Sequence, residues 1–94
     1  MYHKIFWVYI MGSVSGTLYI GITNNLYRRV LQHRTKSNEG FTRKYGCTRL
    51  LYYEEFSYVL NAIQREKQLK KWNRKKKEIL INSMNPEWID LFYD

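Results

Sequence analysis

The chain has 94 residues, 45% of them hydrophobic, and this length favours one compact domain over residues 1–94 without a second independent core. Lys and Arg total 16 against 8 Asp and Glu, which gives a net charge of +8 and a pI near 9.7. A surface with this positive potential is expected to bind polyanions.

The same composition excludes several classes of protein. No stretch approaches the ~18 consecutive apolar residues that a membrane-spanning helix needs, and the first apolar stretch lacks the cleavage pattern of an export signal. Cys47 is the single cysteine, so a disulfide framework is excluded, and its spacing from His3 and His33 does not match a zinc site. We therefore expect Cys47 to be a packing residue. The protein is expected in the reducing cytoplasm, with no membrane partner.

Two apolar runs near the start of the chain predict a β-hairpin. Residues 5–11 are aromatic and β-branched, residues 17–22 form the second run, and the residues between them are rich in Gly and Ser. A loop centred on Val14 would place Tyr9 directly opposite Tyr19, with both hydroxyl groups on one face. A one-residue bulge would change this register.

A helix is predicted over residues 26–34, after the capping residues Thr23, Asn24 and Asn25. Arg29 and His33 are four residues apart, so they lie on one flank of this helix. Residues 35–49 show no sustained periodicity and indicate a loop.

The remaining segments predict one strand and two helices. Residues 50–56 indicate a third strand, and Ser57 is expected to cap a helix over about residues 58–72. A further helix begins at Asn73, and residues 85–88 open a last short turn. The order strand, strand, helix, strand, helix, helix predicts an α+β domain.

Glu66 stands out in the helix over residues 58–72. The apolar residues of that helix form a stripe with Glu66 at its centre; they are Val59, Ala62, Ile63 and Leu69. A carboxylate on a buried face is costly unless it is paired or bound to a metal. One interpretation is an ion pair with an arginine. The other is a divalent ion held against phosphate oxygens, because hard cations prefer oxygen ligands.

A run of basic residues surrounds Glu66. Eight cations occur within thirteen positions: Arg65, Lys67, Lys70, Lys71, Arg74, Lys75, Lys76 and Lys77. Such a run can be a merely solvated face, but here it favours a phosphate-facing surface whose binding depends strongly on salt. The residues expected to contact nucleic acid are Arg28, Arg43, Lys44, Arg65, Lys70, Lys71 and Arg74.

These residues together resemble a known family. The ordered set is Val8-Tyr9-Ile10, Tyr19-Ile20-Gly21, Arg29, His33 and Glu66. The spacing and order resemble the GIY-YIG nuclease superfamily, in particular its small single-domain bacterial members, over nearly the whole chain. One departure is that the first motif here is Trp7-Val8-Tyr9-Ile10, so the glycine and isoleucine before the tyrosine are replaced.

The resemblance implies a three-stranded antiparallel sheet flanked by helices, and a metal-dependent endonuclease that hydrolyses DNA phosphodiester bonds. It implies that Glu66 holds one divalent ion, Mg²⁺ or Mn²⁺, and that Arg29 stabilises charge on the scissile phosphate. Tyr9 or Tyr19 would position or deprotonate the attacking water. A protein partner could supply targeting, because no separate DNA-reading module is present.

The general base is left open between a tyrosine and His33. A tyrosine with an unperturbed pKa near ~10 is a poor base at neutral pH unless a metal or nearby positive charge activates it. His33 has an ordinary pKa closer to neutrality and is the competing base.

The family also carries a polar asparagine late in the domain. Three residues are candidates, Asn73, Asn82 and Asn85. Asn85 is favoured, although it is also expected to cap the last short turn.

Two other classes of function remain compatible with the sequence. One is a basic nucleic-acid-binding module without catalysis, in which the tyrosines stack or pack. The other is a structural protein of a ribonucleoprotein. The apolar and acidic C-terminal segment, residues 88–94, argues against the second, because we expect it to dock on the core.

Overall fold

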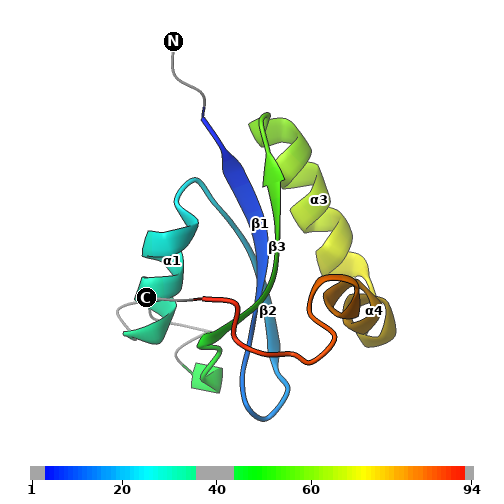
Figure 1. The fold of residues 1–94 in the computed structure, drawn as a ribbon. Coiled ribbons are helices and arrows are strands. Elements are labelled where there is room, and N and C mark those ends of the chain that lie inside the picture. Colours follow the sequence, from blue (N-terminus) through cyan, green and yellow to red (C-terminus); the bar gives the residue numbers. More distant parts are fainter. Residues whose placement is uncertain (1–3, 36–43, 93–94) are drawn as a thin grey trace.

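The computed structural model describes residues 4–35 and 44–92. Its elements in chain order are β1 (Phe6–Gly12), β2 (Leu18–Thr23), α1 (Leu26–Arg34), β3 (Arg49–Phe56), α3 (Val59–Lys71) and α4 (Arg74–Met84). The three strands form one antiparallel sheet in the order β2-β1-β3. Figure 1 shows α1 and the C-terminal segment on one face of this sheet, and α3 and α4 on the other. The α+β architecture predicted from the sequence is confirmed.

The register of the hairpin differs from the expectation by two residues. Tyr9 pairs with Gly21, and Tyr19 pairs with Met11, so the two tyrosines are diagonal neighbours and the predicted direct pairing is wrong. The reason is that the loop comprises residues 13–17 in place of 12–16, so it is centred on Ser15; a hydrogen bond from the Ser13 amide to the Thr17 carbonyl at 2.9 Å closes it. A shift of two keeps every side chain on its own face, since side chains alternate along a strand.

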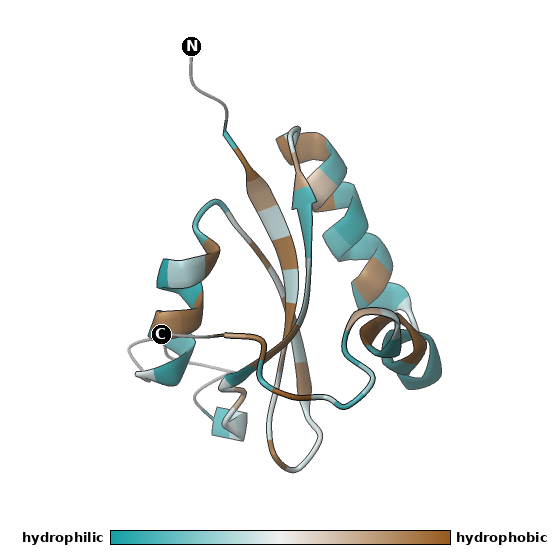
Figure 2. Ribbon diagram, viewed as in Figure 1, coloured by the Kyte–Doolittle hydropathy of each residue, from teal (hydrophilic) through white to brown (hydrophobic). Residues whose placement is uncertain are grey.

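Strand β1 is covered on both faces, so alternate residues enter two different cores. Val8 and Ile10 belong to the core beneath α3 and α4, while Tyr9 and Met11 belong to the core beneath α1. All four side chains are fully buried. Figure 2 shows the alternation of hydropathy along β1 and the hydrophilic outer surface of α3. Cys47 is buried in the α1 core, as expected of a packing residue.

Asparagine side chains start two of the helices. The Asn25 side chain accepts a hydrogen bond from the Arg28 amide, and Asn73 caps α4 in the same way. Helix α3 is different, because its N-cap is Tyr58 and no side chain bonds to its first amides. The expectation that Ser57 caps this helix is therefore wrong. None of the helices in the described ranges is long and apolar enough to cross a bilayer.

The C-terminal segment docks on the sheet. The Leu91 amide donates to the Leu50 carbonyl at 2.8 Å, and the Asp90 carboxylate accepts from the Leu50 amide at 3.1 Å. Asp90 also forms an ion pair with Arg34 of α1. Trp88 packs against the core beneath α3 and α4. Residues up to 92 are thus held in place by both cores.

Candidate active site

Three side chains from β1 and α1 meet in the core beneath α1. The Tyr9 hydroxyl lies 3.0 Å from His33 Nε2, and Arg29 Nε donates to the same hydroxyl oxygen at 3.3 Å. Arg29 and His33 are one helical turn apart, so a single docking of α1 on β1 brings both to Tyr9. Arg29 Nη1 also donates to Gln32 Oε1 at 3.1 Å, which orients the guanidinium.

The protonation of His33 follows from its surroundings. Burial, followed by the positive charge of Arg29, lowers the pKa of His33 to about 4, so the imidazole is neutral at physiological pH. Because Arg29 already donates to the Tyr9 oxygen, the Tyr9 proton is the one shared with His33 Nε2. Nε2 is then an acceptor, and the proton of the neutral ring lies on Nδ1.

Tyr9 is a protonated phenol in this arrangement. Burial raises its pKa to about 12, although the hydrogen bond from Arg29 opposes the shift. Its ring lies over Gly21 of β2: a Cβ atom at that position would be 2.5 Å from the hydroxyl oxygen and 2.6 Å from Cζ. Glycine is therefore required there for the Tyr9 ring to reach His33.

Tyr19 is the half-buried member of the cluster. Its ring centroid lies 6.2 Å from that of Tyr9 and 5.2 Å from that of His33. It also lines an open hollow of about 250 Å³ between β2 and the helices α3 and α4. The other lining residues are Leu18, Ile20, Lys70 and Lys77. Tyr19 thus connects the buried cluster to the basic surface.

Glu66 lies on the side of α3 that turns toward the protein. Ala62 and Leu69 of the same stripe are buried, and the Glu66 side chain is 17% exposed. Val59 is 41% exposed, so the expectation that it belongs to this stripe is wrong. The Glu66 carboxylate is paired with Lys70 Nζ at 3.3 Å. The structure therefore contains the ion pair that was one of the two interpretations of Glu66. Its partner is a lysine on the same helix and not the expected arginine.

Comparison with known proteins identifies the family of this chain. The family model described as the GIY-YIG catalytic domain matches residues 5–79. This chain belongs to the GIY-YIG family. GIY-YIG domains are a nuclease family and act on nucleic acid, so the class of substrate follows from membership.

The relatives are other small GIY-YIG-like proteins. The UPF0213 protein of Bacillus pumilus (strain SAFR-032) is 35% identical over 79 residues, which are 84% of this chain and 81% of the relative. The UPF0213 protein of Clostridium perfringens (strain 13 / Type A) is 38% identical over 77 residues, with 82% and 83% covered. The solution NMR structure of the UPF0213 protein from Bacillus halodurans superimposes with a TM-score of 0.60 at 28% identity, covering 89% of each chain.

A divalent metal is a general feature of GIY-YIG nucleases. In this chain Glu66 would be a single protein ligand for such a metal. Among residues 4–35 and 44–92, no group of three or more His, Cys, Asp and Glu side chains could hold a metal ion. A metal at Glu66 would therefore need further oxygen ligands from water and from substrate phosphates, which is a common way to hold Mg²⁺. The single carboxylate of Glu66 would suit a metal site whose remaining ligands are substrate phosphates and water.

Most of the residues expected to contact nucleic acid lie on the protein surface. Arg28, Lys44, Lys70, Lys71 and Arg74 are exposed, whereas Arg43 lies outside the described residues. Arg74 is additionally paired with Glu78 at 2.9 Å. The exposed cations supply the basic surface that the composition predicted.

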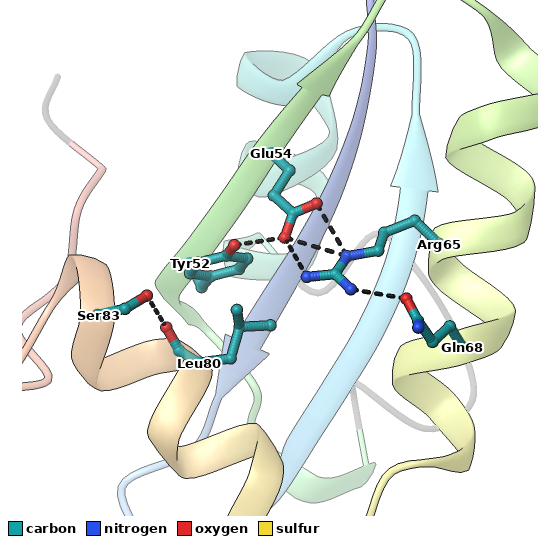
Figure 3. A network of polar contacts seen from close by, with 6 residues as sticks. All are labelled: Tyr52, Glu54, Arg65, Gln68, Leu80 and Ser83. Carbon is teal, nitrogen blue, oxygen red and sulfur yellow. Dashed lines mark hydrogen bonds and ion pairs between the residues drawn. The ribbon is translucent and has the colours of Figure 1, made fainter.

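Arg65 is engaged inside the protein. Figure 3 shows its guanidinium against Glu54 of β3, with Nε at 3.0 Å from Oε1 and Nη2 at 2.9 Å from Oε2. The Tyr52 hydroxyl donates to the same carboxylate, and Arg65 Nη1 donates to Gln68 Oε1 at 2.6 Å. This network ties α3 to β3. Because the charge of Arg65 is already paired with Glu54, it has less to offer a phosphate, and the DNA-binding surface proposed below does not include Arg65.

Each candidate for the late asparagine has a structural contact. Asn73 caps α4, and Asn82 accepts a hydrogen bond from Trp88 Nε1 at 2.6 Å. Asn85 ends α4 as its C-cap, and its buried amide donates to the carbonyls of Leu51 and Ile89. Asn85 also opens the predicted last short turn, because the Trp88 amide donates to its carbonyl at 3.0 Å and the Ile89 amide donates to its side chain at 3.1 Å. The turn is not helical.

Three residues of the site were not singled out from the sequence. Gln32 orients Arg29, Gly21 makes room for Tyr9, and Lys77 lines the hollow beside Tyr19. Gln32 had a detectable signal, because it lies three residues after Arg29 on the same helix. Lys77 had no such signal. It is one of four consecutive basic residues, and only the packing of α4 shows which of them lines the hollow.

Proposed function

We propose that this protein is a metal-dependent DNA endonuclease whose catalytic centre is the cluster around Tyr9 together with Glu66. The observation that carries the proposal is the hydrogen-bonded set of Tyr9, Arg29 and His33, which meets the basic surface at Tyr19. A buried phenol that shares its proton with a neutral imidazole, beside a fixed cation, is a costly arrangement for packing alone. It is suited to holding a phenol and a cation in fixed positions next to a developing negative charge.

In this proposal Glu66 is the protein ligand of one Mg²⁺ or Mn²⁺ ion. When bound, the ion supplies charge neutralisation at the phosphate and lowers the pKa of water near it. Lys70 must leave the carboxylate first, and its 53% exposed side chain allows that movement.

Arg29 is the residue proposed to stabilise the phosphate as negative charge develops. Its hydrogen bond to Tyr9 is the main cause that raises the pKa of the guanidinium, so it stays charged. Its Nε and Nη1 atoms are fixed by Tyr9 and Gln32, so the cation is positioned before the substrate arrives. A cation fixed in advance stabilises a transition state without a reorganisation cost.

Tyr19 is proposed to be the phenol that contacts the substrate. Tyr9 is fully buried and His33 is 2% exposed, whereas Tyr19 borders the open hollow. Tyr9 and His33 would act behind it by holding the hydrogen bonds beside Tyr19 and Arg29 in place. The pKa of Tyr9 is raised to about 12 and that of His33 is lowered to about 4, so His33 is a poor acceptor for the Tyr9 proton. Of the two kinds of residue left open as the base, the proposal therefore favours a tyrosine, Tyr19, over His33.

DNA is proposed to lie across the exposed cations of α3 and α4, with Arg28 and Lys44 as further backbone contacts. These contacts are to phosphates, so they would give affinity without sequence selectivity. Selection of particular sites would then come from DNA structure or from a protein partner.

The direct test is cleavage of supercoiled plasmid and of branched oligonucleotides by purified protein with Mg²⁺ or Mn²⁺. Glu66→Gln is expected to fold and to bind DNA but to lose cleavage. The matched control is Glu78→Gln, which removes an acid paired with a cation four residues away on α4 and should keep activity. Binding without cleavage by the wild type would instead support the alternative, a non-catalytic nucleic-acid-binding module.

A further inference from the structure

The hollow beside Tyr19 brings together two lysines from different helices. Lys70 of α3 and Lys77 of α4 both line it, together with Tyr19 of β2. Lys77 is half-buried, and its ammonium group has no ion pair with any other residue in the described ranges. A half-buried cation without a counterion is a candidate site for an anion.

The second lysine of the hollow is shared with the proposed metal ligand. Lys70 Nζ lies 3.3 Å from Glu66 Oε2, and the carboxylate is far less exposed than the ammonium group, at 17% against 53%. The carboxylate is therefore fixed by the fold, whereas the lysine is free to swing on its long chain. Lys70 can reach either Glu66 or the hollow.

We propose that this hollow binds a DNA backbone phosphate adjacent to the one that is cleaved, and that Lys70 passes from Glu66 to that phosphate when a divalent ion takes the carboxylate. The proposal rests on the proposed function and assigns its phosphate subsite to Lys70 and Lys77. In the absence of metal, Lys70 neutralises Glu66, so the hollow has only Lys77 to offer a phosphate. Metal and DNA would then bind cooperatively, because each releases a group that the other needs.

The exchange of Lys70 between Glu66 and the phosphate would make DNA binding depend on the metal. DNA that arrives without metal meets a site in which one of the two cations is occupied, and it binds more weakly. DNA that arrives with metal gains the Lys70 contact and a ligand for the ion from its own phosphate. Tight binding is thereby restricted to the state that can react.

A double-mutant cycle in EDTA tests the exchange without using activity. Glu66→Gln releases Lys70, so DNA affinity is expected to rise about fivefold or more. The slope of log affinity against log salt should steepen by about 0.9, the value for one added phosphate contact. In a Lys70→Gln background, Glu66→Gln should leave that slope unchanged and lose most of the gain in affinity.

Lys71→Gln is the matched background, because it removes the same charge from the next residue of α3, which has no ion pair with Glu66. The gain from Glu66→Gln should persist there in full. An equal gain in the Lys70→Gln and Lys71→Gln backgrounds would overturn the exchange, since the effect would then be general electrostatics. Lys77→Gln should lower the salt slope by about 0.9 in every background, and an unchanged slope would overturn the phosphate subsite.

The outcome is separable from that of the proposed function. A wild type that cleaves with Mg²⁺ but shows no coupling between Glu66 and Lys70 refutes the exchange and leaves the nuclease standing. Coupling without cleavage refutes the nuclease and leaves a phosphate-binding hollow.

Discussion

At the scale of single residues, the contact between Tyr9 and His33 is what separates this site from ordinary packing. Both side chains are buried and lie within hydrogen-bond distance at 3.0 Å, while burial and the charge of Arg29 lower the pKa of His33 and keep its imidazole neutral. The sequence identified both residues through the family resemblance. It could not show their contact, because that depends on how closely α1 docks on β1.

The buried His33 makes stability depend on pH. Its pKa is 6.5 in an unfolded chain and about 4 in the folded protein, so between these values the unfolded state binds more protons. Stability is complete above pH 6.5 and falls as the pH is lowered through this window, by about 2 kcal/mol between pH 7 and pH 5. Urea denaturation at the two pH values measures it. His33→Gln should remove this component while His3→Gln retains it, and an equal pH response in both variants would refute the assignment.

Gly21 allows a second test at the same scale. A methyl group there would overlap the Tyr9 ring, with 2.5 Å to its oxygen. Gly21→Ala is therefore expected to destabilise the protein by roughly 1–3 kcal/mol, the usual range for overpacking, as measured by thermal or urea unfolding. In a Tyr9→Leu background the cost should shrink, because the overlapping ring atoms are gone. The same cost in both backgrounds would show that the Tyr9 ring is not the obstacle.

At the scale of elements, the strands and helices were predictable, and their ends and pairings were less so. Hydrophobic alternation predicted β1 and β2, but the register depended on the Ser13–Thr17 hydrogen bonds, which place the turn one residue later in the chain. The start of α3 was misplaced because Ser57 is a good capping residue that this helix does not use. The strand residues of the site still lie on the predicted faces of the sheet, because a two-residue shift in register keeps each side chain on its own face.

The docked C-terminal segment is an element whose contribution can be measured. Trp88 packs on the core beneath α3 and α4, and its indole donates to Asn82 at 2.6 Å. Because the side chain is only partly buried, Trp88→Ala should cost roughly 2–3 kcal/mol, below the range for fully buried tryptophans. Ile89→Ala, at a neighbouring position that is 48% exposed, is the control and should cost much less. Equal unfolding midpoints for wild type and Trp88→Ala would show that the segment is not docked.

At the scale of the whole molecule, exposed cations are most frequent on α3 and α4, and one cluster carries the proposed chemistry. The net charge of +8 predicted a polyanionic partner, and family membership agrees with nucleic acid. The sequence could not separate cations that face solvent from those used inside the fold, as Arg65 shows by its pairing with Glu54. That distinction needed the packing of α3 on β3.

The most direct measurement of the central claim compares two adjacent arginines. Arg28 and Arg29 are neighbours on α1, but only Arg29 bonds to Tyr9. Plasmid cleavage with Mg²⁺ should be absent in EDTA. At protein concentrations that saturate the DNA, so that a lost backbone contact at Arg28 does not limit the rate, cleavage should be nearly unchanged in Arg28→Gln and slower by about 100-fold or more in Arg29→Gln, the usual loss for one fixed charge-stabilising group. Equal cleavage rates for Arg28→Gln and Arg29→Gln would contradict a catalytic centre at Tyr9.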